Sequence, residues 1–100
     1  MADMVVVYWR DIPAQVIVKA GRRTARRQLA ERFEQAIDRA AMRAKLTGTD
    51  AYLEQWRRAD PMPCGDDLEA EAVAAAETLE TEYTPERLRD LVANGGLADA

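Results

Sequence analysis

The chain has 100 residues, with 14 Lys and Arg against 18 Asp and Glu, one cysteine and no histidine. A chain of this length forms one small hydrophobic core. One cysteine excludes an internal disulfide, and the lack of histidine excludes the common Ser-His and Cys-His triads and removes the commonest zinc ligand. We therefore predict a single domain over residues 1–100, frayed at 97–100, without catalytic residues, a metal site or a cofactor.

The first elements in the chain are two short apolar runs. Met4 to Arg10 is rich in β-branched and aromatic residues, and Gln15 to Lys19 alternates so that Val16 and Val18 share one face. The stretch 11–14 between them contains a proline and predicts a turn. The two runs therefore indicate a hairpin.

A long amphipathic helix is predicted over residues 27–46. Its apolar residues recur at spacings of three and four. They are Leu29, Phe33, Ala36, Ile37, Ala40, Ala41 and Ala44. Gly48 suits the left-handed position after the end of this helix. We expect this helix to cover one face of the sheet.

The stretch 50–60 fits both a helical turn and a strand. We favour one helical turn that runs into a third strand paired with the hairpin, because a hairpin alone is marginally stable. Residues 61–65 contain two prolines and a glycine and predict a loop.

Two acidic helices complete the predicted α+β domain. Asp66 and Asp67 open the first of them, whose stripe runs from Leu68 to Tyr83. The second begins at Thr84 and Pro85 and ends at residues 94–96. We predict a small antiparallel sheet packed against the long helix and flanked by these two helices.

Charge is divided unevenly along the chain. Residues 1–60 carry 12 basic against 8 acidic side chains, and residues 61–100 carry 2 against 10. This division indicates either a basic binding face or two halves that attract each other within the fold. A nucleic-acid-binding domain is usually basic overall, so the net charge of −4 argues against a nucleic-acid partner.

Few side chains offer chemistry. Cys64 lies in a Pro-Cys-Gly stretch with no base or cation beside it to lower its pKa. The carboxylates of residues 66–82 diverge around a helix and lack the spacing of a calcium loop. No leader pattern and no apolar stretch of about 20 residues is present, which predicts a cytoplasmic protein without a membrane contact.

The strongest polar feature is a cluster of arginines from Arg22 to Arg27, just before the predicted long helix. These guanidinium groups could bind phosphates, a carboxylate ligand or an acidic protein surface, or could pair with the acidic helices of the same chain. Trp9 and Trp56 could stack on a flat ligand or serve the core.

Several blocks resemble a known family. The most specific are Tyr8 to Pro13 and Arg32 to Met42, supported by Gln15 to Lys19, Arg22 to Arg27 and Asp50 to Arg58. They resemble the small bacterial family described as virulence factor, over nearly the whole chain. The resemblance assigns no catalytic residue, and it implies an accessory protein of folate- and corrinoid-dependent one-carbon or methionine metabolism.

These observations predict a non-enzymatic accessory or interaction domain whose partner is a protein with an acidic surface. The alternative is a binder of a small anion such as a folate or nucleotide. Both hypotheses use the same side chains, which are Arg10, Arg22, Arg23, Arg26, Arg27, Arg57, Arg58, Trp9 and Trp56.

Overall fold

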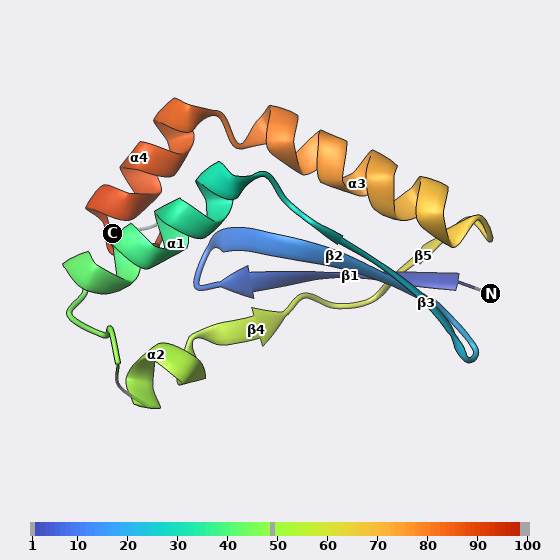
Figure 1. The fold of residues 1–100 in the computed structure, drawn as a ribbon, viewed down its shortest axis with the longest axis horizontal. Helices are drawn as coiled ribbons and strands as arrows, with labels where there is room; N and C mark the ends of the chain where they lie inside the picture. The colour runs from blue at the N-terminus through green and yellow to red at the C-terminus, as the bar shows by residue number, and fades with distance from the viewer. Residues whose placement is uncertain (1, 49, 99–100) are drawn as a thin grey trace.

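The computed structural model describes residues 2–48 and 50–98, and within them it has an antiparallel sheet and four helices (Figure 1). The strands are β1 (Ala2–Trp9), β2 (Ile12–Ala20), β3 (Arg23–Gln28), β4 (Trp56–Arg58) and β5 (Met62–Cys64). The helices are α1 (Glu31–Arg43), α2 (Asp50–Glu54), α3 (Leu68–Glu82) and α4 (Pro85–Ala93). The strand order is β3-β2-β1-β4, and β5 pairs with the beginning of β1. The predicted α+β class is confirmed.

The predicted N-terminal hairpin is present, with a tighter turn than expected. Trp9 pairs with Ile12, so the turn consists of Arg10 and Asp11, and Arg10 has a positive φ of 53°. Pro13 lies within β2, where the register between the strands shifts. A bulge tolerates a proline because one residue there makes no ladder hydrogen bond.

The arginine cluster forms a strand, and the prediction that residues 27–30 begin the long helix is wrong. Residues 23–28 pair with residues 15–20 of β2, and α1 begins only at Glu31. Ala25 is the one buried residue of this strand. It provides too little apolar pattern for sequence reasoning, so pairing with β2 decides the conformation.

The ambiguous stretch 50–60 contains both elements that we favoured. The short helix α2 leads into β4, which pairs with residues 7–9 of β1. The loop predicted at residues 61–65 is wrong in part, because Met62–Cys64 pairs with Ala2–Met4. Prolines are tolerated there since β5 lies at an edge of the sheet.

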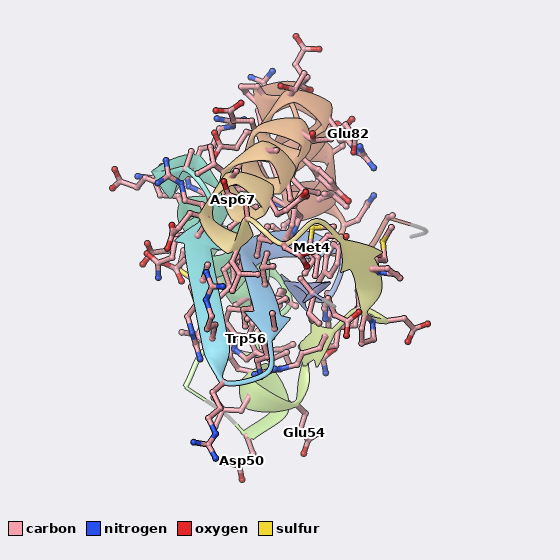
Figure 2. All side chains as sticks on the ribbon, turned by 90° about the vertical axis from the view of Figure 1, so that its right-hand side faces the viewer. Met4, Asp50, Glu54, Trp56, Asp67 and Glu82 are labelled. Carbon is pink, nitrogen blue, oxygen red and sulfur yellow. The ribbon has the colours of Figure 1, made fainter. Side chains whose placement is uncertain are left out.

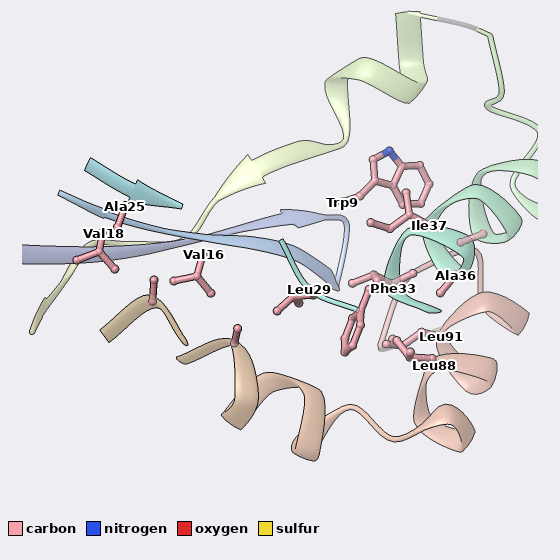
Figure 3. Close-up of a cluster of buried hydrophobic side chains, with 14 of the residues drawn as sticks. Trp9, Val16, Val18, Ala25, Leu29, Phe33, Ala36, Ile37, Leu88 and Leu91 are labelled. Carbon is pink, nitrogen blue, oxygen red and sulfur yellow. The ribbon is translucent and has the colours of Figure 1, made fainter. Parts of the chain in front are cut away.

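Helix α3 covers one face of the sheet, the role that we had assigned to the long helix before it. It runs along β2 and β3 (Figures 1 and 2). Val16 and Val18 point toward it from β2, together with Ala25 from β3 (Figure 3). The α3 residues beneath them are Leu68, Ala72 and Ala76, all buried. Small side chains on both sides allow the helix to lie close to the strands.

Helices α1 and α4 pack on each other at one end of the sheet. There Trp9 points away from α3 and toward Ile37 of α1 (Figure 3). Trp9 is fully buried, and its Nε1 donates to the Tyr52 carbonyl oxygen at 3.0 Å. Gly96 has φ +92°, and a Cβ there would lie 2.8 Å from the Trp9 ring. The tail after α4 must therefore have a glycine at this position.

Helices α3 and α4 begin with side-chain caps, whereas the N-cap of α1 is Ala30 and provides none. Asp67 accepts from the Ala70 amide at the start of α3, and Thr84 accepts from Arg87 at the start of α4, as the sequence indicates. Helix α1 ends three residues earlier than predicted. Lys45 is the first left-handed residue after it, with φ 61°, and Gly48 is left-handed as well, with φ 74°.

Fraying was expected at residues 97–100, and the structure describes only the first two of them. The Leu97 amide donates to the Asn94 carbonyl oxygen, and the Ala98 amide donates to the Asp11 carboxylate at 2.7 Å. Residues 99 and 100 lie outside the described residues.

The sheet face opposite α3 carries helices only at the end occupied by Trp9, where α1 and α2 lie (Figures 1 and 2). We call the remainder the open face. Paired residues of an antiparallel sheet project to the same side, so the pairing identifies its members. They are Asp3, Val5 and Val7 of β1, Gln15, Ile17 and Lys19 of β2, Thr24, Arg26 and Gln28 of β3, and Trp56 and Arg58 of β4.

Candidate functional site

The strand β3 divides the arginine cluster between the two faces of the sheet. Arg26 pairs with Ile17 and lies on the open face. Arg23 and Arg27 pair with residues on the α3 side, and Arg22 lies in the turn before the strand. All four side chains are exposed, and β3 is an edge strand of the sheet.

The centre of the open face is apolar and its surroundings are basic. Ile17 is 0% exposed and Val7 is 8% exposed, although no helix lies over this part of the sheet. Their cross-strand neighbours are Arg26 and Arg58. Long arginine stems can cover apolar side chains while their guanidinium groups stay in water, and we infer that they contribute to this burial.

Most of these cations lack an internal acceptor. Arg57 and Asp11 form the one ion pair among the described residues, at 3.2 Å. No side-chain hydrogen bond or ion pair joins the remaining predicted arginines to any part of residues 2–48 and 50–98. These arginines are Arg22, Arg23, Arg26, Arg27 and Arg58. The internal pairing with the acidic helices, which the charge division also allowed, is therefore not made by side-chain contacts in this part of the chain.

Two predicted arginines instead stabilise the fold. The Arg10 side chain donates to the Gln55 side chain at 3.1 Å and to the Gly95 carbonyl oxygen at 2.9 Å. Arg57 donates to the Arg10 carbonyl oxygen at 2.9 Å, and its guanidinium carbon lies 4.5 Å from the centre of the Tyr8 ring. Both guanidinium groups tie the hairpin turn to distant segments and are less available to a partner.

The two tryptophans have different environments. Trp9 is fully buried, so its ring offers no surface to a ligand, and its role is packing. Trp56 is 38% exposed and lies on the side of the sheet opposite α3 (Figure 2). Only Trp56 can contribute an aromatic edge to the open face.

Trp56 lines two hollows of opposite charge. The first, of about 250 Å³, is also lined by Tyr52 and by the carboxylates Glu34 and Asp38 of α1. Burial is the main cause that raises the pKa of Tyr52 above 10.0, and the charge of Asp38 adds to it. The second hollow is lined by Val7 and Gln15 together with Arg57 and Arg58. An anion is thus favoured on the arginine side of Trp56 and disfavoured on the Tyr52 side.

Cys64 lies away from these groups. Burial raises the pKa of its thiol, and the charges of Glu71, Asp3 and Asp66 raise it further. These effects disfavour the reactive thiolate. No group of three or more His, Cys, Asp or Glu among the described residues could hold a metal ion, and no helix in this part of the chain could cross a membrane.

Sequence reasoning missed the apolar centre of the open face and the polar residues around it. Gln15, Lys19 and Gln28 belong to this surface and were not selected. The signal that could have found them is alternation, because residues 23–28 place Thr, Arg and Gln on one side and Arg, Ala and Arg on the other. That signal becomes informative only once the segment is recognised as a strand.

We compared the sequence with models of known protein families. A model described as virulence factor matches residues 7–92. This chain belongs to the virulence factor family. The resemblance inferred from its sequence blocks is confirmed, and the open face with its arginines lies largely within the matched range of this family member. No curated protein and no solved structure matches it significantly.

Proposed function

We propose that this family member is a non-enzymatic interaction domain whose open face and β3 edge bind an acidic surface of a partner protein. The observation that carries the proposal is the group of exposed arginines whose side chains have no acceptor within residues 2–48 and 50–98. Arg26 and Arg58 of this group lie beside Ile17 and Val7, and the others line the β3 edge. Arginine suits this role because its planar guanidinium group binds carboxylates through two hydrogen bonds.

The shape of the surface supports a protein partner. The open face is formed by four adjacent strands and is held by the sheet, so binding orders little backbone. Arg26 and Arg58 are cross-strand neighbours of the apolar residues Ile17 and Val7. A partner that contacts both would gain charge pairing and also bury apolar area, which is the usual composition of an interface centre and rim.

The acidic helix α3 supports the orientation of binding. It lies on the opposite face of the sheet and carries Glu69, Glu77 and Glu82 on its exposed side. An acidic partner is repelled from that side and steered toward the arginines. By family resemblance, a folate- or corrinoid-dependent methyl-transfer enzyme is the first partner to test.

The alternative function, a small anion stacked on a tryptophan, has weaker support. Trp9 is buried, and the hollow between Tyr52 and Trp56 is lined by Glu34 and Asp38. A folate or nucleotide at 100 times its dissociation constant would raise the free energy of unfolding by ~2.7 kcal/mol, which a thermal-shift screen detects.

The test is quantitative capture from native lysate followed by titration with the purified partner. We compare the parent chain with a patch variant carrying Arg22→Ala, Arg26→Ala and Arg58→Ala. We expect the variant to bind at least about tenfold more weakly, and the association rate of the parent to fall with salt.

The matched control variant removes three exposed cations elsewhere, through Arg39→Ala, Lys45→Ala and Arg89→Ala. It makes the same change in net charge and should keep the partner. If the patch variant retains the same partner at the same affinity, or if both variants lose it equally, the proposed surface is wrong.

A further inference from the structure

A second basic site lies far from the open face, in the groove between α1 and α4. This groove has a volume of about 260 Å³. Its charged lining consists of three arginines and contains no carboxylate. They are Arg32 and Arg39 from α1 and Arg89 from α4.

The floor of the groove is apolar. Ala36 and Leu88 are 5% and 4% exposed and face each other where the two helices meet (Figure 3). Pro85 and Val92 continue the floor along α4. A ligand that fits must therefore place an uncharged body against the floor and its charge against the arginines.

Arg32 is held in position by the corner between α3 and α4. Its Nη2 donates to the carbonyl oxygens of Glu80 and Tyr83. Its Nε is buried and has no acceptor within residues 2–48 and 50–98. This guanidinium group is thus a fixed positive charge. Within the described residues no carboxylate pairs with it, and its Nε has no acceptor.

Arg39 and Arg89 complete the charge of the groove from opposite walls. Both side chains are exposed, and no side-chain hydrogen bond or ion pair joins either to another described residue. Two unpaired cations beside a third that is fixed raise the local potential, and an anion between them relieves the repulsion among the three.

We propose that the groove between α1 and α4 binds a small organic anion, with a carboxylate or phosphate group held by Arg32, Arg39 and Arg89 and a flat or aliphatic body on Ala36, Leu88 and Val92. The volume is below the about 300–1,000 Å³ of sites for drug-sized ligands, so the occupant is a small molecule. This site is separate from the proposed protein-binding surface and shares no residue with it.

The test is a titration of the intact chain followed by NMR, with the arginine side-chain Nε–H signals as the readout. The probes are phenyl phosphate and benzoate, which distinguish the two anionic groups. Two incomplete probes serve as controls. Phenol lacks the negative charge, and inorganic phosphate lacks the apolar body. We expect at least one aromatic anion to saturate in the millimolar range and to shift the Arg32 signal, and both incomplete probes to bind about tenfold more weakly.

Two variants make the result specific. Arg39→Gln with Arg89→Gln removes two exposed cations of the groove and should weaken the binding of the aromatic anion about tenfold. The control Arg22→Gln with Arg23→Gln makes the same change in net charge near the β2–β3 turn and should leave binding unchanged.

Arg32 itself is not replaced, because it holds the α3–α4 corner and its loss could unfold the chain. The proposal is overturned if neither aromatic anion gives a saturable shift, if inorganic phosphate binds as tightly as phenyl phosphate, or if the groove variant binds as tightly as the control.

Discussion

The two faces of the sheet are built from the same strands and have opposite chemistry. On the α3 side, Val16, Val18 and Ala25 are buried against alanines of the helix. Ile17 follows Val16 and Arg26 follows Ala25 in sequence, so both project to the open face, where they lie side by side without a helix above them. Packing of the covered face therefore depends on alanines of α3 that fit against the strands. On the open face, we infer that long neighbouring side chains shield the apolar centre from water.

A buried charge on the covered face should have the largest effect. Val16→Lys places an ammonium group between β2 and α3 without a partner, and should cost about 3–5 kcal/mol of the free energy of unfolding. The neighbouring change Gln15→Lys puts the same group on the open face and should cost less than about 1 kcal/mol. Urea denaturation followed by circular dichroism compares the two; equal losses would show that the faces do not differ as described.

Overpacking of the covered face should come next. Ala76→Leu adds volume where α3 touches the strands and should cost about 1–3 kcal/mol. Ala74→Leu makes the same change at an exposed position of the same helix and should alter stability by less than about 0.5 kcal/mol. Thermal unfolding of the two variants measures the difference, and tolerance of Ala76→Leu would contradict close packing of α3.

The free energy of unfolding should depend more on the length of the Arg26 side chain than on its charge. Arg26→Ala uncovers Ile17 and should cost about 0.5–1 kcal/mol, whereas Arg26→Met keeps a stem of similar length and should cost little. Arg23→Ala, on the same strand, serves as a control. Destabilisation of equal size by Arg26→Met in urea titrations would mean that the guanidinium group, and not its stem, stabilises this face.

The smallest effect is a loss of stability at high pH. Burial is the main cause that raises the pKa of both Tyr8 and Tyr52 above 10.0. Since the folded state holds these protons more tightly, their contribution is complete below about pH 10 and is lost as the pH rises through the folded pKa values. Urea midpoints across this range should fall, and Tyr8→Phe with Tyr52→Phe should flatten the fall. A slope that both substitutions leave unchanged would contradict this assignment.

The elements that could be predicted are those with strong local signals. The hairpin runs, the cap Thr84 and the stripe of α3 are confirmed because β-branched runs, side-chain acceptors and helical spacing act over a few residues. The structure brings some of the predicted site residues together and separates others. Arg26, Arg58 and Trp56 lie together on the open face. The side chains of Arg10 and Arg57 instead donate hydrogen bonds to backbone carbonyl oxygens, and Trp9 is buried.

The α+β class, the hairpin and the two C-terminal helices follow from local sequence patterns, because each depends on neighbouring residues. Three features depend on tertiary contacts: residues 23–28 form a strand, residues 62–64 pair with the beginning of β1, and α3 covers the face of the sheet that was assigned to α1. The physical reason is that an arginine run or a proline-rich stretch has little intrinsic preference for a strand. Its backbone becomes a strand when the edge of an existing sheet satisfies its hydrogen bonds.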